Sequence, residues 1–159
     1  MARKRPTAKK KLRMAFIGAG GIAGTHMRYL AEMDDVALVA LADISEDAMA
    51  GRAEEFGIDA AFTDYRKMLR EVKPDAVSVC TPNGMHARAS IAASTAGADV
   101  LVEKPMAMNA REAQGMIDAA KKSHRKLVIG FQHRYDPRTQ FVRNAVEAGQ
   151  LGKVVYARV

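Results

Sequence analysis

Short apolar runs alternate with longer segments of helical period along almost the whole chain, and this alternation limits the fold more than any other feature. The predicted strands are 12–17, 36–42, 60–63, 76–80, 99–102 and 127–131. The predicted helices are 22–33, 47–56, 65–72, 86–96, 110–123 and 138–148. A helix between two successive strands returns the chain to the same edge of a sheet, so the strands pair in parallel. We therefore predict a doubly wound α/β sheet whose functional surface lies at the carboxyl ends of its strands.

A glycine-rich segment, residues 18–24, lies between the first predicted strand and the first predicted helix. Its sequence, Gly-Ala-Gly-Gly-Ile-Ala-Gly, matches the dinucleotide fingerprint with Ala23 at the third small position. Gly18 permits the tight turn, and Gly20 lets a pyrophosphate approach the backbone closely. The helix that follows offers unpaired N–H groups and a partial positive charge to the phosphates. The segment therefore predicts a Rossmann-type nucleotide site.

Asp43 supports the same site and bears on the choice of cofactor. It follows the second predicted strand, 19 residues beyond Gly24, where a carboxylate can accept hydrogen bonds from the ribose of adenosine. Its charge would repel the 2′-phosphate of NADP, and Ile44 and Ser45 supply no cation. Arg52 lies too far along the next predicted helix to be assigned as a phosphate ligand. NAD is therefore expected in preference to NADP.

Two further motifs follow predicted strands and open onto the same edge of the sheet. Residues 103–105, Glu-Lys-Pro, are either a surface ion pair or a catalytic motif. In the catalytic interpretation Lys104, partly desolvated against a nicotinamide ring, polarises or deprotonates a substrate hydroxyl. Residues 81–86, Thr-Pro-Asn-Gly-Met-His, are either a loop that starts a helix or a segment whose Asn83 and His86 face the cofactor.

The positive charge of the chain is concentrated at its N-terminus. The formal net charge is +7, but seven of the 25 Lys and Arg lie in the first thirteen residues, which contain no Asp or Glu. We predict a basic, disordered arm over residues 1–12, with no aromatic residues between its charges and hence no nucleic-acid site. The arm and the apolar glycine motif together also imitate a signal peptide, but cleavage there would remove the motif.

The remaining composition excludes several classes of function. One cysteine cannot form an internal disulfide, and the four histidines lack metal-ligand spacing, so no metal site is expected. No run of 18 apolar residues is present, so we expect no membrane span and a cytoplasmic protein. Cys80 is expected to be a small buried residue, and His26 and His124 to be ordinary helix-surface residues. Arg134 either contacts a substrate or braces a following domain.

Four segments, taken together, resemble the nucleotide-binding half of the Gfo/Idh/MocA oxidoreductases. They are 18–26 (GAGGIAGTH), 81–86 (TPNGMH), 102–105 (VEKP) and 130–137 (GFQHRYDP). The resemblance implies that Lys104 takes part in proton transfer or substrate orientation. The residues that the fingerprint and the resemblance mark as cofactor contacts are Gly18, Gly20, Gly21, Ile22, Asp43, Thr81, Pro82, Asn83, His86, Glu103 and Lys104.

The resemblance also implies a domain arrangement and an activity. We expect an arm at 1–12, a dinucleotide-binding domain at 13–135, and a linking helix at 136–159 that leads, from residue 153, into the first strand of a largely missing C-terminal domain. The parent enzyme, expected to be a homo-oligomer, would transfer a hydride between NAD and the secondary alcohol of a sugar, polyol or related small molecule. This chain alone would show little or no turnover, because one wall of the crevice is absent.

Two alternatives remain open from the sequence. The chain can be a non-catalytic nucleotide-binding or interaction module that pairs its last predicted strand with a partner. It can also be part of a hydrolase or lyase of the same fold, because some members of the resembled family use NAD transiently.

Overall fold

The computed structural model describes residues 10–158 and divides the chain into two compact units between Ile129 and Gly130. The predicted arm lies largely outside the described residues. Residues 132–135, which we assigned to the dinucleotide-binding domain, form the short 3-10 helix η2 (Gln132–Tyr135) and pack with helix α6 (Pro137–Glu147) of the second unit.

The first unit alternates strands and helices as the sequence predicts. Its strands are β1 (Leu12–Ile17), β2 (Val36–Ala42), β3 (Ala61–Phe62), β4 (Ala76–Val79), β5 (Asp99–Val102) and β6 (Leu127–Ile129). Its helices are α1 (Gly21–Ala31), α2 (Glu46–Phe56), α3 (Tyr65–Val72), the 3-10 helix η1 (Asn83–Met85), α4 (His86–Thr95) and α5 (Ala110–Lys122). The bounds of the elements agree with the predicted ones to within two residues.

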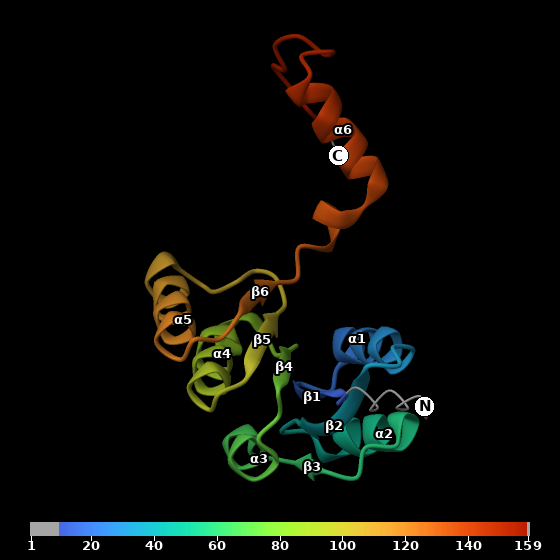
Figure 1. Ribbon diagram of the computed structural model, residues 1–159, viewed down its shortest axis with the longest axis vertical. Helices are drawn as coiled ribbons and strands as arrows, with labels where there is room; N and C mark the ends of the chain where they lie inside the picture. The colour runs from blue at the N-terminus through green and yellow to red at the C-terminus, as the bar shows by residue number, and fades with distance from the viewer. Residues whose placement is uncertain (1–9, 159) are drawn as a thin grey trace, which may run out of the picture. The chain divides into compact units, whose positions relative to one another are not determined.

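The described strands form one parallel sheet in the order β3-β2-β1-β4-β5-β6 (Figure 1). Strand order runs outward from β1 to β3 on one side and from β4 to β6 on the other. The reversal therefore lies between β1 and β4, where adjacent loops leave the sheet in opposite directions and open a crevice. The predicted doubly wound, Rossmann-type sheet is confirmed.

Alternate residues of the central strand face two different layers of helices. Ala15 and Ile17 of β1 belong to the core that packs against α3, α4 and α5. Met14 and Phe16 belong to the core that packs against α1 and α2. This period of two, with apolar residues on both faces, is what a sheet covered on both sides requires. Figure 1 shows the two groups of helices on the two sides of the sheet.

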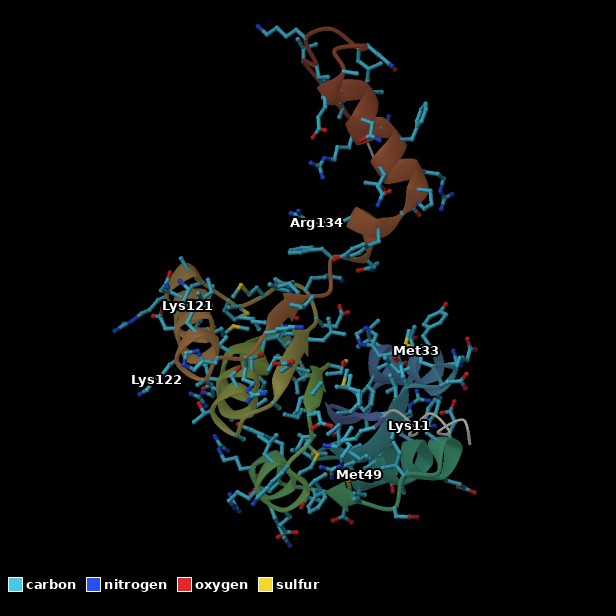
Figure 2. The ribbon with its side chains drawn as sticks, viewed as in Figure 1. Lys11, Met33, Met49, Lys121, Lys122 and Arg134 are labelled. Carbon is cyan, nitrogen blue, oxygen red and sulfur yellow. The ribbon has the colours of Figure 1, made fainter. Side chains whose placement is uncertain are left out.

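Side chains cap most of the helices of the first unit. Ser45, Asp64 and Asn109 each accept a backbone N–H at the start of α2, α3 and α5, which satisfies a donor that the helix itself cannot pair. Lys121 and Lys122 project from the last turn of α5 (Figure 2), where positive charge complements the helix dipole. Helix α1 has no side-chain cap, and this difference matters for the site described below.

In the second unit, Asp136 caps α6, and hydrogen bonds from Arg138 lower the pKa of this carboxyl. The Arg134 guanidinium lies 5.5 Å from the ring centroid of Phe131. The strand expected from residue 153, as the first strand of a further domain, stays a prediction, and residues 153–158 form no strand by themselves. A strand needs a partner for its backbone N–H and C=O groups, and no described residue pairs with this segment. No helix in residues 10–158 is long and apolar enough to cross a membrane.

Gly18 cannot be replaced by alanine without loss of stability. Its φ is +103°, and a Cβ there would lie 2.5 Å from the carbonyl oxygen of Cys80. We expect Gly18→Ala to lower the free energy of unfolding by about 2–4 kcal/mol in urea denaturation, because backbone strain and a steric clash add up.

The matched control is Gly51→Ala, at an exposed position of α2 where a Cβ meets no atom within 4 Å. Alanine there should leave the stability unchanged or raise it by about 0.5–1 kcal/mol. Equal stabilities of the two variants would contradict this account of the turn.

Candidate functional site

The turn after β1 is held in shape by Asp43 at the end of β2. Its Oδ2 accepts the N–H of Ala19 at 2.6 Å, and its Oδ1 accepts the N–H of Ser45 at 2.9 Å. The N–H of Gly18 donates to the carbonyl of Ala42 at 2.8 Å. Each oxygen of the half-buried carboxylate keeps a lone pair for a further donor. Asp43 therefore shapes the turn and can still accept a hydrogen bond from a ligand.

Helix α1 begins in front of this turn with free backbone N–H groups. Its N-cap residue, Gly20, has no side chain to accept them, and the first turn holds no acidic residue. The first N–H groups of a helix have no partner within the helix. A Cβ placed at Gly20 or Gly21 would meet nothing within 4 Å, so the space in front of the helix is open. Free donors and the positive end of the helix dipole beside open space suit a phosphate group.

A pocket of about 610 Å³ lies beside the turn, at the carboxyl ends of β1, β2 and β4. Tyr65 and Thr81 belong to its lining, and the hydroxyl oxygen of each is buried without a hydrogen-bond partner in the described part of the chain. A buried hydroxyl without a partner costs free energy. These two oxygen atoms are therefore not committed to any contact within the described residues.

The pocket brings together predicted cofactor contacts from three separate loops. Those that line it are Gly18, Gly20, Asp43, Thr81 and Pro82. Those that are exposed and outside its lining are Gly21, Ile22, Asn83 and Lys104. Those that are buried behind the surface are His86 and Glu103. The glycine turn, the end of β2 and the loop after β4 therefore meet at one place, as parallel strands require.

His86, the first residue of α4, joins two loops beneath the surface. It is 1% exposed, and its Nδ1 lies 2.7 Å from the carbonyl oxygen of Pro105, while its Nε2 lies 2.9 Å from that of Thr81. Because both partners are acceptors, both contacts are hydrogen bonds only when the ring carries two protons. Both nitrogen atoms of His86 thus lie against backbone carbonyls of the protein, and its contact with a cofactor stays a prediction.

A second histidine, His26 of α1, lies against the ends of β4 and β5. Its Nε2 lies 3.2 Å from Oε1 of Glu103, and its Nδ1 lies 2.9 Å from Oγ of Ser78. The side chain of His26 is only 18% exposed. The prediction of an ordinary helix-surface residue is wrong here, because His26 adjoins the buried stripe of α1. His124 is exposed, as expected, but it follows the end of α5 with a φ of +54°.

Lys104 lies just past the end of β5 with its side chain exposed. Oε2 of Glu103 accepts the N–H of Lys104 at 3.2 Å, and Glu103 itself is only 8% exposed. The Lys104 side chain makes no hydrogen bond or ion pair with any described residue. Lys104 and Pro105 both lie at the surface, and desolvation of this lysine against a nicotinamide ring stays a prediction. The protein therefore fixes the backbone of Lys104 and leaves its ammonium group accessible.

The sequence gives no indication of Tyr65 as a pocket residue, and none of the contacts of Arg52 with the glycine turn. Nε of Arg52 donates to the carbonyl of Ala19 at 3.3 Å, and its guanidinium pairs with Glu55. A Cβ at Gly24 would overlap this guanidinium, so the glycine makes room for it. No local pattern indicates these contacts, because they depend on how α2 and α3 pack beside the glycine turn.

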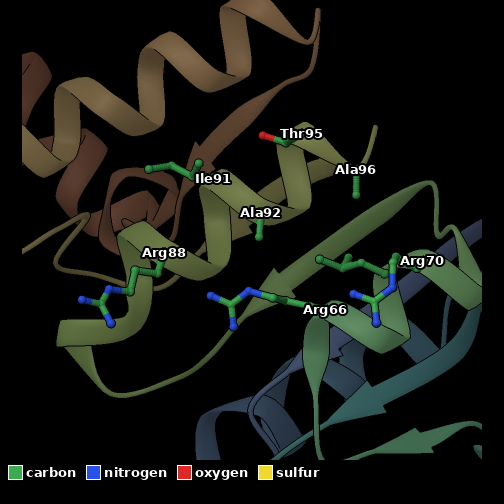
Figure 3. A pocket seen from close by; sticks show the side chains of 8 residues that line it. Arg66, Arg70, Arg88, Ile91, Ala92, Thr95 and Ala96 are labelled. Atoms are coloured by element: carbon green, nitrogen blue, oxygen red, sulfur yellow. The ribbon is translucent and has the colours of Figure 1, made fainter.

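A second hollow of about 610 Å³ lies between α3 and α4 (Figure 3). It is lined by Arg66, Arg70 and Arg88, none of which forms an ion pair with a described residue. It contains no predicted site residue and lies between helices, away from the glycine turn. We therefore place the candidate site at the strand ends. Among residues 10–158, no group of three or more His, Cys, Asp or Glu side chains could hold a metal ion.

The strand order and the uncapped glycine turn at the β1–β4 reversal define a dinucleotide-binding Rossmann domain. Residues 12–131 match the family model described as "Oxidoreductase family, NAD-binding Rossmann fold". The chain belongs to this family, the Gfo/Idh/MocA oxidoreductases, and carries its NAD-binding domain. The resemblance inferred from the four sequence segments is confirmed.

Known relatives include dehydrogenases of sugars and polyols. D-glucoside 3-dehydrogenase of Escherichia coli K12 is 40% identical over 144 residues, which cover 90% of this chain and 41% of the relative. Myo-inositol 2-dehydrogenase of Thermotoga maritima is 32% identical over 148 residues, which cover 93% of this chain and 44% of the relative. The crystal structure of the WlbA dehydrogenase from Bordetella pertussis, in complex with NADH and UDP-GlcNAcA, superposes with a TM-score of 0.85 at 28% identity. The match covers 91% of this chain and 44% of the WlbA chain. The chain therefore spans less than half the length of these relatives.

Cys80 should be an unreactive thiol although it lines the pocket. Burial raises its pKa to about 11; the hydrogen bond with Ser78 lowers the pKa, and the charge of Glu103 raises it. In the unfolded chain a pKa near 8.5 leaves a sizeable thiolate fraction at pH 8. Alkylation by iodoacetamide at pH 8 should therefore be about 100-fold slower in the folded chain than in the unfolded chain.

The alkylation rate of the folded chain should keep rising up to about pH 11. Keeping this thiol neutral contributes to folding stability below about pH 8.5. This contribution is lost as the pH rises toward the pKa of the folded-state thiol, about 11. A folded-state rate that levels off below pH 9, or that equals the unfolded rate at pH 8, would contradict this description. The chain has one cysteine, so all labelling reports on Cys80.

Proposed function

We propose that this chain holds NAD in the pocket beside the glycine turn and is the cofactor domain of a dehydrogenase for a secondary alcohol of a sugar, polyol or related small molecule. The observation that carries the proposal is the uncapped start of α1, which faces open space at Gly20 next to the carboxylate of Asp43. The names of two relatives, a glucoside 3-dehydrogenase and an inositol 2-dehydrogenase, support the substrate class.

The residues of the pocket fit the parts of a dinucleotide. The pyrophosphate would accept hydrogen bonds from the N–H groups of Gly21 and Ile22 at the start of α1. The free lone pairs of Asp43 would accept the ribose hydroxyls of adenosine. The buried hydroxyls of Tyr65 and Thr81 would gain polar partners, which would remove the cost of leaving them unpaired.

The same residues favour NAD over NADP. The negative charge of Asp43 would repel a 2′-phosphate, and neither Ile44 nor Ser45 supplies a positive charge near it. Arg52 comes close to the turn, but its guanidinium is already bound to Glu55 and to a carbonyl of the turn. Among residues 10–158, no cation at this corner is therefore free to bind the additional phosphate.

Lys104 is the residue that we propose acts on the substrate hydroxyl. When bound, NAD supplies the acceptor for the hydride that leaves the alcohol carbon. The unprotonated Nζ of Lys104 would accept the hydroxyl proton, and the protonated form would donate a hydrogen bond to the resulting carbonyl oxygen. The exposure of this side chain leaves room for a substrate beside it. Thr81 and Pro82 would line the nicotinamide side of the pocket, and Glu103 would support it from behind the surface.

Turnover requires more than this domain. The chain matches 41–44% of the length of its relatives, and hydride transfer requires the alcohol carbon to be held against the nicotinamide. We propose that the residues which hold the substrate lie in the part of those relatives that this chain does not match. The chain alone should therefore bind NAD without oxidising an alcohol.

Gly20→Ala should separate cofactor binding from folding. A Cβ at this position meets no protein atom within 4 Å, and the φ of −71° suits alanine, so the Tm should not change. The added methyl group would stand where the pyrophosphate approaches the backbone, and the affinity for NAD should fall by about tenfold or more. Isothermal titration calorimetry measures the affinity, and Gly51→Ala on α2 is the control that should bind like the wild type.

Two results would overturn the proposal. Absence of binding by the wild-type chain at millimolar NAD would show that the pocket is wrongly assigned, and equal affinities of Gly20→Ala and the wild type would show that the pyrophosphate lies elsewhere. The NADH absorbance of the same samples should stay at its baseline after addition of myo-inositol or a glucoside. Formation of NADH would contradict the proposed inactivity of the isolated chain.

A further inference from the structure

A row of polar contacts runs from Cys80 to the backbone of Lys104. Sγ of Cys80 lies 3.4 Å from Oγ of Ser78, which lies 2.9 Å from Nδ1 of His26. Nε2 of His26 lies 3.2 Å from Oε1 of Glu103, and Oε2 of Glu103 accepts the N–H of Lys104 at 3.2 Å. We call the side chains of Cys80, Ser78, His26 and Glu103 the polar cluster.

The chemistry of each group sets the direction of these hydrogen bonds. A carboxylate only accepts, so Nε2 of His26 donates to Glu103. In the neutral ring, Nδ1 then accepts from the hydroxyl of Ser78. The thiol of Cys80, which burial keeps protonated, lies 3.4 Å from Oγ of Ser78 and 3.6 Å from Nδ1 of His26, within reach of either acceptor. Every donor in the polar cluster therefore has an acceptor while the imidazole is neutral.

Glu103 depends on His26 for its side-chain contact. The residue is 8% exposed, and no Lys or Arg side chain in the described part of the chain forms an ion pair with it. A buried carboxylate that has lost its partner is strongly unfavourable. Without the imidazole, Glu103 would turn toward water or take up a proton, and either change would release the N–H of Lys104.

The chain is also anchored on the other side of Lys104. Nδ1 of the buried His86 lies 2.7 Å from the carbonyl oxygen of Pro105. The residues before and after Lys104 are therefore each held by a histidine, one from α1 and one from α4. The Lys104 side chain makes no polar contact of its own with described residues, so its position is set through the backbone.

We infer that His26 is a positioning residue for the dehydrogenase reaction, which fixes the backbone of Lys104 through the buried carboxylate of Glu103. The inference rests on the proposed function, in which Lys104 acts beside the nicotinamide and Glu103 lies buried behind the surface next to it. His26 acts through Glu103, so its loss should disturb the nicotinamide half of the site and leave the adenosine half, shaped by Gly18 and Asp43, intact.

Two conservative substitutions of His26 test the inference in the 159-residue chain. In His26→Gln the longer amide side chain can replace Nε2 as the donor to Glu103, whereas in His26→Asn the shorter amide reaches only as far as Nδ1. Calorimetry would compare NAD with ADP-ribose, which lacks the nicotinamide. His26→Asn should bind NAD about tenfold more weakly and ADP-ribose within about twofold of the wild type. His26→Gln should bind both ligands like the wild type.

The backbone amide resonance of Lys104 provides a second readout that a general loss of stability does not move. It should shift in His26→Asn, because the hydrogen bond to Glu103 is lost, and remain in place in His26→Gln. His124→Asn, an exposed site beyond α5, is the control for both readouts. If His26→Asn does not fold, Glu103→Gln should show the same separation of NAD from ADP-ribose, because an amide offers one acceptor atom instead of two.

The outcomes distinguish this inference from the proposed function. If the wild-type chain binds both ligands and His26→Asn binds NAD with the same affinity as the wild type, the positioning role is overturned and the proposed function stands. Equal loss of NAD and ADP-ribose would also overturn it, because the defect would then be general. Failure of the wild-type chain to bind either ligand would overturn the proposed function and the inference together.

Discussion

The left-handed turn at Gly18 is the constraint on which the rest of the site depends. Strand β1 lies in the middle of the sheet, and its carboxyl end must pass close to the backbone of the neighbouring strand before α1 begins. Gly18 meets both demands because it tolerates a φ of +103° and has no Cβ to strike the carbonyl of Cys80. Asp43 then fixes the turn from the end of β2. Three loops therefore converge on one pocket, and α1 begins with its N–H groups free.

Around this turn, the domain combines buried polar contacts with exposed reactive groups. His26 and His86 are held by the protein and use their nitrogen atoms to position the segment that carries Lys104. The hydroxyls of Tyr65 and Thr81 remain without a partner in the described residues, and the side chain of Lys104 remains exposed. Groups that support the structure are thus satisfied, whereas those proposed to contact ligands are available. This division is typical of a site carried by a rigid scaffold.

The fold was predictable from the sequence because its signals are local. Apolar runs and helical periods indicate each strand and helix, and the position of residues 18–24 between a strand and a helix indicates the fingerprint. The parallel sheet then implies that Asp43, Thr81 and Glu103 come to the same edge, since each follows a strand. Residues 153–158 form no strand by themselves, because strand propensity alone does not supply a pairing partner.

The details of the site were not predictable in this way. His26 appeared to be a surface residue because its partners, Ser78 and Glu103, are distant in the sequence and are brought to it only by the packing of α1 on β4 and β5. Arg52 was set aside because of its distance along the chain, although its long side chain reaches the turn from α2. Contacts of this kind depend on the packing of helices on the sheet and leave no periodic signal.

The most direct test of the account is a titration of the isotopically labelled chain with NAD, followed by the backbone amide signals in ¹H–¹⁵N correlation spectra. The account predicts that the largest shifts occur at residues 18–22, 43–45 and 81–85, with smaller shifts at 103–104. The signals of Arg66, Arg70 and Arg88, in the hollow between α3 and α4, should stay in place. Shifts concentrated at those three arginines, with the glycine turn unchanged, would contradict the assignment of the cofactor site.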